Sequence, residues 1–219
     1  MRGTFIVIDG PDRCGKDEVV KFLKLHFPDA VYAREPGGTD DAERVRDIVK
    51  HPASKLNPLT QLCLFFAARS DLLEKAIRPA LENGKHCILP RSDSSTLAYQ
   101  VEGEGKGDKG LWNLFWTMRE ECFGSCKPNL YILLDVPVEI SRGRPESEGD
   151  EKDYFEQQQD EDHEKAKRIQ LGFLKFHHVN HTPTVVVDAA QPLEVVQQEV
   201  LKIIREEIAY KQKREAGAY

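Results

Sequence analysis

The stretch that decides the fold is Phe5-Ile-Val-Ile-Asp-Gly-Pro-Asp-Arg-Cys-Gly-Lys16, near the start of the sequence. It opens with a continuous apolar run, which is typical of a parallel strand buried on both faces. Residues 10–16 then match the pattern G-x-x-x-x-G-K. Glycines in such a turn let backbone amides surround a phosphate, and a helix that follows points its positive end at the same place. The stretch therefore predicts a strand, a phosphate-binding turn and a helix.

The remaining sequence alternates short apolar runs with longer amphipathic stretches, which predicts a parallel sheet wrapped by helices. We expect strands at Thr4–Asp9, Val31–Arg34, His86–Leu89, Leu130–Asp135 and Thr184–Val187. We expect helices at Lys16–His26, Asp41–Lys50, Pro58–Glu82, Ser94–Tyr99, Leu111–Gly124, Glu156–His178 and Leu193–Lys213. The predicted fold class is α/β: a three-layer sandwich of the P-loop NTP hydrolase type, with a five-stranded parallel sheet. Residues 1–219 are expected to form a single domain.

Two segments have the composition of long, mobile loops. Val101–Gly110 contains four glycines in ten residues, and 142–153 is charged and has no apolar anchor. Either is usually a solvated connection, but a long loop in a compact domain is also where a lid would lie. We expect a short lid at about 142–155.

Composition limits the partners of the protein. The 31 Lys and Arg residues against 37 Asp and Glu give a net charge of −6, which disfavours nucleic acid as a partner. No apolar run approaches the about 20 residues of a membrane helix, so no membrane partner is expected. Five scattered cysteines without a Cys-x-x-Cys pair, and no leader-like N-terminal run, predict reduced thiols and a cytoplasmic location.

The turn itself leaves one question open. Lys16 is placed to reach the β- and γ-phosphates of a nucleotide, but Asp17 stands where the usual pattern has a Ser or Thr that binds Mg²⁺. A carboxylate there can ligate Mg²⁺, repel the phosphates if no metal intervenes, or cap the helix. The sequence does not decide between these alternatives.

Several further stretches, in the right order and over nearly the whole chain, resemble the thymidylate kinase family. They are Arg34-Glu-Pro-Gly-Gly-Thr39, Glu43-Arg-Val-Arg46, Leu64-Phe-Phe-Ala-Ala-Arg69, Arg91-Ser-Asp-Ser-Ser-Thr-Leu-Ala-Tyr-Gln100, Leu134-Asp-Val-Pro137 and Asp153-Tyr-Phe-Glu156. The resemblance implies transfer of the γ-phosphoryl group of ATP to dTMP, giving dTDP and ADP, with Mg²⁺ as cofactor. It also implies a homodimer, for which the long 58–82 helix is a plausible interface.

The resemblance also implies contacts to the acceptor base. Phe65 matches the aromatic residue on which the thymine ring stacks, and Arg69, one helical turn later, resembles the arginine that bonds the base edge. Polar contacts come from Thr96 and Gln100, with Ser95 and Tyr99 close by. The neighbouring Phe66 is instead expected in the core.

Other residues match contacts to the rest of dTMP. Arg91 resembles the arginine that grips the acceptor phosphate, and Arg46 resembles a second such contact. The alternative for Arg46 is a solvated helix face. Asp12 matches a carboxylate that orients the nucleotide near its 3′-hydroxyl, and Glu35 resembles a further acidic contact.

The ATP side is implied to include the whole turn and two arginines of the lid. The expected ATP-binding residues are Gly10, Pro11, Asp12, Arg13, Cys14, Gly15, Lys16, Asp17, Arg142 and Arg144. Arg13, Lys16 and Arg91 are the expected catalytic residues, and Arg13 would neutralise charge on the transferring phosphoryl. Arg142 and Arg144 are secondary candidates for that role. Cys14 is expected to be open to oxidation when ATP is absent.

Two departures from the family pattern bear on the metal. The family has Asp-Arg after the strand that precedes Arg91, whereas this chain has Pro90, and Asp17 replaces a hydroxyl. One hypothesis is that Asp17 supplies the carboxylate lost at position 90. The lid also has Tyr154 in place of an arginine. Two alternatives follow: a kinase of the same fold with another or broader deoxynucleotide acceptor, and a catalytically impaired nucleotide-binding protein.

Overall fold

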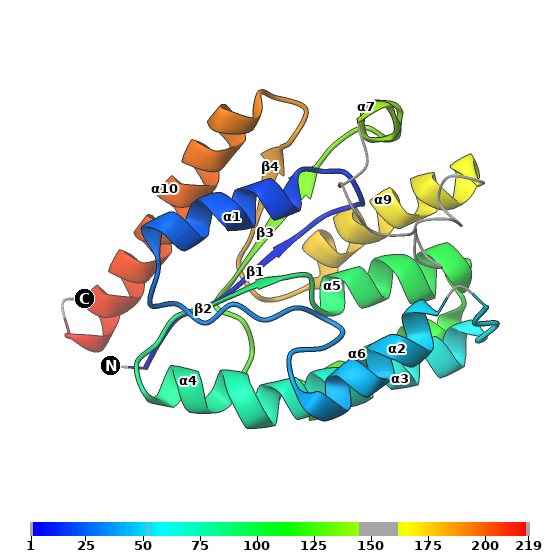
Figure 1. The fold of residues 1–219 in the computed structure, drawn as a ribbon, viewed down its shortest axis with the longest axis horizontal. Coiled ribbons are helices and arrows are strands. Elements are labelled where there is room, and N and C mark those ends of the chain that lie inside the picture. The colour runs from blue at the N-terminus through cyan, green and yellow to red at the C-terminus, as the bar shows by residue number, and fades with distance from the viewer. Residues whose placement is uncertain (1, 52, 145–161, 218–219) are drawn as a thin grey trace.

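Four parallel strands form the sheet at the centre of the computed structural model, which describes residues 2–51, 53–144 and 162–217 (Figure 1). Their order is β2-β1-β3-β4. The strands are β1 Phe5–Asp9, β2 Cys87–Pro90, β3 Leu130–Asp135 and β4 Thr184–Asp188. Ile8 of β1 lies beside Pro90 of β2 and Ile132 of β3, so the carboxyl ends of these strands share one edge of the sheet.

Helices connect the strands. They are α1 Lys16–His26, α2 Asp40–Lys50, α3 Pro58–Leu72, α4 Arg78–Glu82, α5 Asp93–Thr96, α6 Lys109–Phe123, α7 Val138–Gly143, α9 His163–Val179 and α10 Leu193–Glu215. Two π-helical segments, η1 Leu73–Ile77 and η2 Leu97–Glu104, continue α3 and α5. The expected α/β fold with a parallel sheet is therefore confirmed. The expected 58–82 helix is present as α3, η1 and α4 in succession.

The expectation of five strands is wrong, because the 31–34 segment pairs at one residue only. Val31 bridges to Cys87, with hydrogen bonds between Val31 and the backbone of His86 and Ile88. The chain then turns away at Pro36, which has no N–H to offer a sheet, and at two glycines with positive φ.

Alternate residues of β1 face opposite layers, as the geometry of a strand requires. Phe5 and Val7 pack in a core with residues of α3, α6 and α9, whereas Ile6 and Ile8 pack with residues of α1 and α10. Figure 1 shows α1 and α10 on one side of the sheet and α3, α4 and α6 on the other. All five residues of β1 are buried, so the apolar run was a sound indicator of a central parallel strand.

The glycine-rich 101–110 segment is not the expected mobile loop. Its first four residues belong to η2, and Val101 and Glu102 are buried. Glu102 pairs with Lys175 of α9 at 2.6 Å, and a Cβ at Gly103 would lie 2.8 Å from Ile169 of the same helix. The glycine thus permits a close approach between η2 and α9, which holds the segment in place.

The lid expected at about 142–155 lies mostly outside the described residues. Residues 145–161, including Tyr154 and the expected start of a helix at Glu156, lie outside the described residues, whereas Arg142 and Arg144 are described. In the described ranges no helix has the length and apolarity to span a bilayer.

Candidate active site

The turn between β1 and α1 has the backbone geometry that its glycines allow. Gly10 has φ 153° and Gly15 has φ 90°, and a Cβ at Gly10 would lie 2.4 Å from the Leu134 carbonyl oxygen. Lys16 is the first residue of α1 and is buried, and its Nζ donates a hydrogen bond to the Gly10 carbonyl at 3.0 Å. The lysine therefore folds back over the turn, at the point where phosphates are expected.

Two expectations about the turn, the capping role of Asp17 and the exposure of Cys14, are wrong. Gly15, and not Asp17, is the N-cap of α1, so the capping role considered for Asp17 is wrong. Asp17 is exposed in the first helical turn, where the helix dipole favours a negative charge. Cys14 is 3% exposed, and its sulfur lies 3.6 Å from Lys16 Nζ, so the expectation of an open thiol is also wrong. The Cys14 side chain points inward and packs in the core with residues of the sheet.

Arg91 follows β2 and faces the turn across the sheet edge. Its guanidinium pairs with the Asp12 carboxylate and donates to Ser95 Oγ at 3.4 Å and Tyr99 Oη at 3.3 Å. Burial alone would raise the pKa of Asp12, but the positive charges of Arg91 and Lys16 outweigh burial and lower it. Three side chains thus hold the guanidinium at the mouth of the turn.

Asp9 is a residue of this region that the sequence reasoning missed. It ends β1, is fully buried, and its carboxylate accepts hydrogen bonds from the Gly10 amide and from the segment after β2. The donors in that segment are the amides of Ser92 and Ser95 and the hydroxyls of Ser94 and Ser95, at 2.6–3.2 Å. The available signal was an acidic residue at the end of a buried strand together with three serines after another strand.

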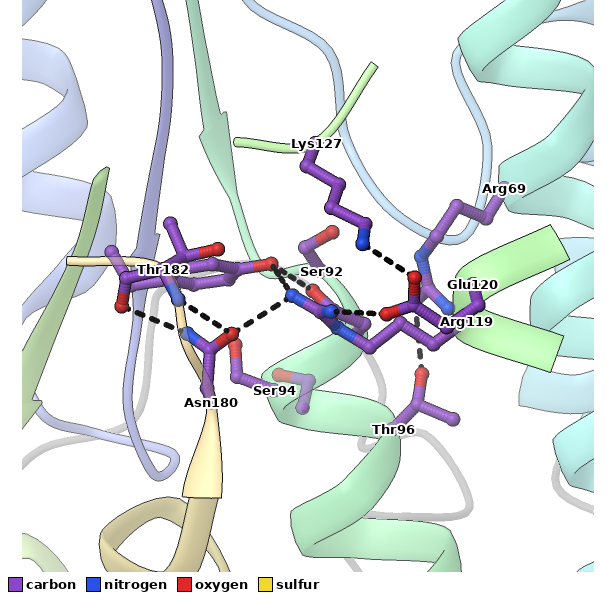
Figure 2. Close-up of polar contacts among 12 residues, drawn as sticks. Arg69, Ser92, Ser94, Thr96, Arg119, Glu120, Lys127, Asn180 and Thr182 are labelled. Atoms are coloured by element: carbon purple, nitrogen blue, oxygen red, sulfur yellow. Dashed lines mark hydrogen bonds and ion pairs between the residues drawn. The ribbon is translucent and has the colours of Figure 1, made fainter. Parts of the chain in front are cut away.

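Arg69 and Glu35 form a buried ion pair beside the segment that follows β2. Arg69 Nε donates to Glu35 Oε2 at 2.7 Å. Arg69 Nη2 donates to Thr96 Oγ1 at 2.9 Å (Figure 2). Both side chains are almost fully buried. Arg69 Nη1 is also buried and has no hydrogen-bond partner within the described part of the chain. An orphaned buried donor calls for a partner, which a ligand carbonyl oxygen would supply.

Burial dominates the titration of Glu35. It raises the pKa of the carboxyl to about 7, although the Arg69 charge lowers it, and the nearby Asp93 carboxylate raises it further. The Ser92 hydroxyl also donates to Glu35 Oε1, at 3.3 Å. Glu35 thus contacts the arginine and not the solvent.

The other expected base contacts lie on α3 and η2. Gln100 is buried and its amide nitrogen donates to Gln61 Oε1 at 3.3 Å. Phe65 is partly exposed, whereas Phe66 is buried in the core beneath the Arg69 guanidinium, 4.8 Å from ring centroid to Cζ. The core position expected for Phe66 is therefore confirmed.

Arg46 contacts the turn that follows Glu35. Its Nη1 donates to the Pro36 carbonyl oxygen at 2.9 Å, and the side chain is half-buried. It therefore lies on an inner side of α2 and not on a purely solvated face. Whether it touches a phosphate is a prediction that the contact does not test.

The arginines at the start of the expected lid lie beside the turn. Arg144 Nη1 donates to the Arg13 carbonyl oxygen at 3.1 Å and Nη2 donates to the Ala189 carbonyl oxygen. Arg13 Nη1 in turn lies 3.5 Å from the Arg142 carbonyl oxygen. All three arginines are thus close to the turn, and which of them meets a phosphoryl group stays a prediction.

A second buried network supports the segment after β2 from its far side. Arg119 of α6 donates to the Asp93 carboxylate at 2.5 Å and to Asn180 Oδ1 at 2.9 Å (Figure 2). Tyr131 of β3 donates its hydroxyl to the other Asp93 oxygen at 2.7 Å. The sequence reasoning missed this network, because its members come from four separate segments.

No group of three or more His, Cys, Asp or Glu side chains in the described residues is arranged to hold a metal ion. A metal at this site would therefore need oxygen ligands from a nucleotide as well as from the protein.

Comparisons with known proteins agree with the geometry. The thymidylate kinase family model matches residues 8–200. A thymidylate kinase of Lactobacillus helveticus is 35% identical over 216 residues, covering 95% of this chain and 98% of that protein. One from Alkalilimnicola ehrlichii is 37% identical over 203 residues, covering 89% of each, and one from Deinococcus radiodurans is 32% identical over 209 residues, covering 94% and 98%.

Proposed function

Because this chain belongs to the thymidylate kinase family, we propose that it transfers the γ-phosphoryl group of ATP to dTMP. An oxygen of the dTMP phosphate attacks the γ-phosphorus, the bond to the β,γ-bridging oxygen breaks, and dTDP and ADP result. Protein side chains need form no covalent bond in this reaction. Their work is to position two nucleotides and to balance negative charge.

One observation carries the proposal: the edge of the sheet brings a phosphate-binding turn and Arg91 together. Lys16 and the turn amides are assigned to the ATP phosphates, and Arg91, held by Asp12, Ser95 and Tyr99, is assigned to the acceptor phosphate. An incoming phosphate would take guanidinium donors that Asp12 now shares. The two phosphoryl groups would then meet between the carboxyl ends of β1 and β2.

A base contact is assigned to Arg69. Its unpartnered Nη1 can donate to a carbonyl oxygen of thymine, whereas the amino group of cytosine at the same position is itself a donor. Partly exposed Phe65, one helical turn earlier, is assigned to stacking on the ring. A site of this kind discriminates strongly, because a wrong base leaves buried donors unpaired.

The test is an ADP-release assay with dTMP, dUMP, dCMP and dGMP as acceptors over a range of Mg²⁺ and Mn²⁺ concentrations. We expect dTMP to react fastest, and a Lys16→Ala variant to be nearly inactive, which controls for contaminating kinases. Equal rates with dCMP or dGMP would favour a broader acceptor range. Binding of ATP and dTMP without any dTDP would favour a nucleotide-binding protein.

We assign the metal to Asp17. Asp9 and Asp12 are occupied by serine donors and by Arg91, whereas Asp17 is exposed and makes no hydrogen bond or ion pair to another described residue. Its oxygens suit Mg²⁺, which would neutralise phosphate charge when it is bound. Without a metal between them, the Asp17 carboxylate would repel the phosphates.

Metal dependence tests this assignment. We expect Asp17→Ala to raise the Mg²⁺ concentration that gives half-maximal turnover by about tenfold, and Asp17→Ser to recover part of the loss. Glu18→Ala, at the exposed neighbouring position, is the matched control and should keep the wild-type metal dependence. Unchanged activity in both Asp17 variants would reject the assignment and the idea that Asp17 replaces the carboxylate lost at position 90.

Two further properties belong to the proposal. We propose a homodimer in which α3, with its exposed Leu59 and Cys63, lies in the interface. We also propose that the enzyme works in the cytoplasm, supplying dTDP for dTTP synthesis, without nucleic acid or membrane partners.

A further inference from the structure

The carboxylate of Asp9 connects the phosphate-binding turn with the 92–95 segment. One oxygen accepts a hydrogen bond from the amide of Gly10, in the turn, at 2.9 Å. The same oxygen accepts a hydrogen bond from the Ser95 hydroxyl. The second oxygen accepts hydrogen bonds from the amides of Ser92 and Ser95 and from the Ser94 hydroxyl. A single buried group is thus bonded both to the ATP side and to the segment that carries Arg91.

The position of Arg91 depends on that segment. Its backbone has φ 69°, in the left-handed region, and its amide donates to the Ile8 carbonyl oxygen at 3.0 Å, next to Asp9. Ser92, which follows it, is held by Asp9 through its amide. The preceding Pro90 offers no polar side chain. Asp9 is therefore the side chain that anchors the backbone just after Arg91.

We propose that Asp9 is a positioning residue for the acceptor phosphate: by binding the 92–95 backbone and the Gly10 amide, it holds the Arg91 guanidinium against the phosphate-binding turn. The inference rests on the proposed function only in taking the anion at Arg91 to be the phosphate of a nucleoside monophosphate. Asp9 itself is fully buried, with both oxygens bonded to protein groups, and acts in this proposal through Arg91.

The hydrogen-bond pattern makes Asn an informative substitution. Both Asp9 oxygens accept backbone N–H groups, which cannot reverse their direction as hydroxyls can. An asparagine in either orientation therefore places its NH₂ against at least one backbone N–H. The 92–95 segment or the turn must then shift, although the side-chain volume is unchanged.

Asp93 provides a matched control from the same segment. It is also a fully buried carboxylate, but its partners are Arg119 and Tyr131, on the side away from the turn. Asp93→Asn removes a buried charge of the same size and is expected to lower stability. It leaves the Asp9 hydrogen bonds in place.

The experiment compares the affinities of the full-length protein for dTMP and for thymidine by calorimetry. The ratio of the two affinities isolates the contribution of the phosphate. We expect Asp9→Asn to lower this ratio about tenfold with little change in the affinity for thymidine, and Asp93→Asn to lower the melting temperature without changing the ratio.

Two further variants test the route of the effect. In an Arg91→Gln background, Asp9→Asn should have no further effect on the ratio. Ser94→Ala, which removes one hydroxyl donor, should lower the ratio about twofold and serves if Asp9→Asn does not fold.

The inference would be overturned if the affinity ratio were unchanged in a folded Asp9→Asn variant. If Asp9→Asn does not fold, an unchanged ratio in Ser94→Ala would overturn it. An effect of Asp9→Asn that is just as large in the Arg91→Gln background would also overturn it. The wild-type rate of dTDP formation is measured in parallel. A failure to form dTDP would reject the proposed function, while the affinity ratio would still decide the role of Asp9.

Discussion

Glu35 and Arg69 lie in contact beside the 92–96 segment, and both are almost fully buried. A buried ion pair contributes little net stability, because the desolvation of both groups offsets their attraction. Its value here is geometric: Glu35 and Thr96 take Nε and Nη2 of Arg69, and Nη1 is left over for a ligand. The pair thus sets which edge of the guanidinium is left for the base contact that we propose.

The raised pKa of Glu35 predicts a pH dependence of stability. The folded protein holds this proton up to about pH 7, whereas a glutamate in the unfolded chain releases it near 4.5. The folded state binds more protons between these values, so the free energy of unfolding contributed by Glu35 falls as pH rises, by at most about 3 kcal/mol. Glu35→Gln should remove this slope between pH 5 and 7 in urea unfolding.

Glu74→Gln is the control, because Glu74 is exposed and its ion pair among the described residues is with Arg78, one helical turn later. It should keep the wild-type slope. If Glu35→Gln and wild type show parallel pH profiles, Glu35 does not titrate in this range in the folded protein.

Among the elements, η2 and α9 approach each other closely next to the candidate site. A Cβ at Gly172 of α9 would lie 2.7 Å from Ala98 Cα and 3.1 Å from Glu102 Cβ. η2 begins at Leu97 and carries Tyr99 and Gln100, so its position against α9 also positions part of the proposed acceptor site. A glycine in mid-helix has a cost of about 1 kcal/mol, which this contact explains.

We expect Gly172→Ala to lower the free energy of unfolding by about 1–3 kcal/mol, because backbone atoms of η2 cannot move aside as a flexible side chain can. Gly143→Ala is the control, since a Cβ there meets nothing within 4 Å. Denaturant unfolding of both variants measures the difference. Equal stability of the two variants would mean that η2 and α9 separate at little cost.

Several elements were predictable from the sequence, and others were not. The 5–16 stretch was predicted correctly because its strand, turn and helix are contiguous and each has its own local signal. The strand at 31–34 has an apolar pattern as well, but Val31 alone pairs among the described residues. Four glycines suggested a loop at 101–110, although two of these glycines allow tight packing at the start of the segment.

At the scale of the molecule, positive side chains gather at the candidate site although the protein carries a net negative charge. The protein is acidic overall, with a net charge of −6, yet Arg13, Lys16, Arg69 and Arg91 gather around the carboxyl edge of β1 and β2. Each of these side chains is held there by hydrogen bonds to carboxylates or carbonyl oxygens. Two anionic nucleotides bound at this edge would therefore face local positive charge, although the protein as a whole is negative. A local cluster of cations decides binding, since screening in physiological salt limits the reach of distant charges to about 8 Å.

The sequence by itself determined the buried central strand, the phosphate-binding turn and the family, because these depend on contiguous residues or on the order of short motifs. Only the tertiary structure decided the number of strands, the link from Asp9 to the 92–95 segment, and the Arg69 donor left for a ligand. Asp9 and Ser94 are 85 positions apart, and Arg69 and Glu35 are 34 apart. Such contacts form when packing brings distant segments together, and no local periodicity encodes which side chains will then meet.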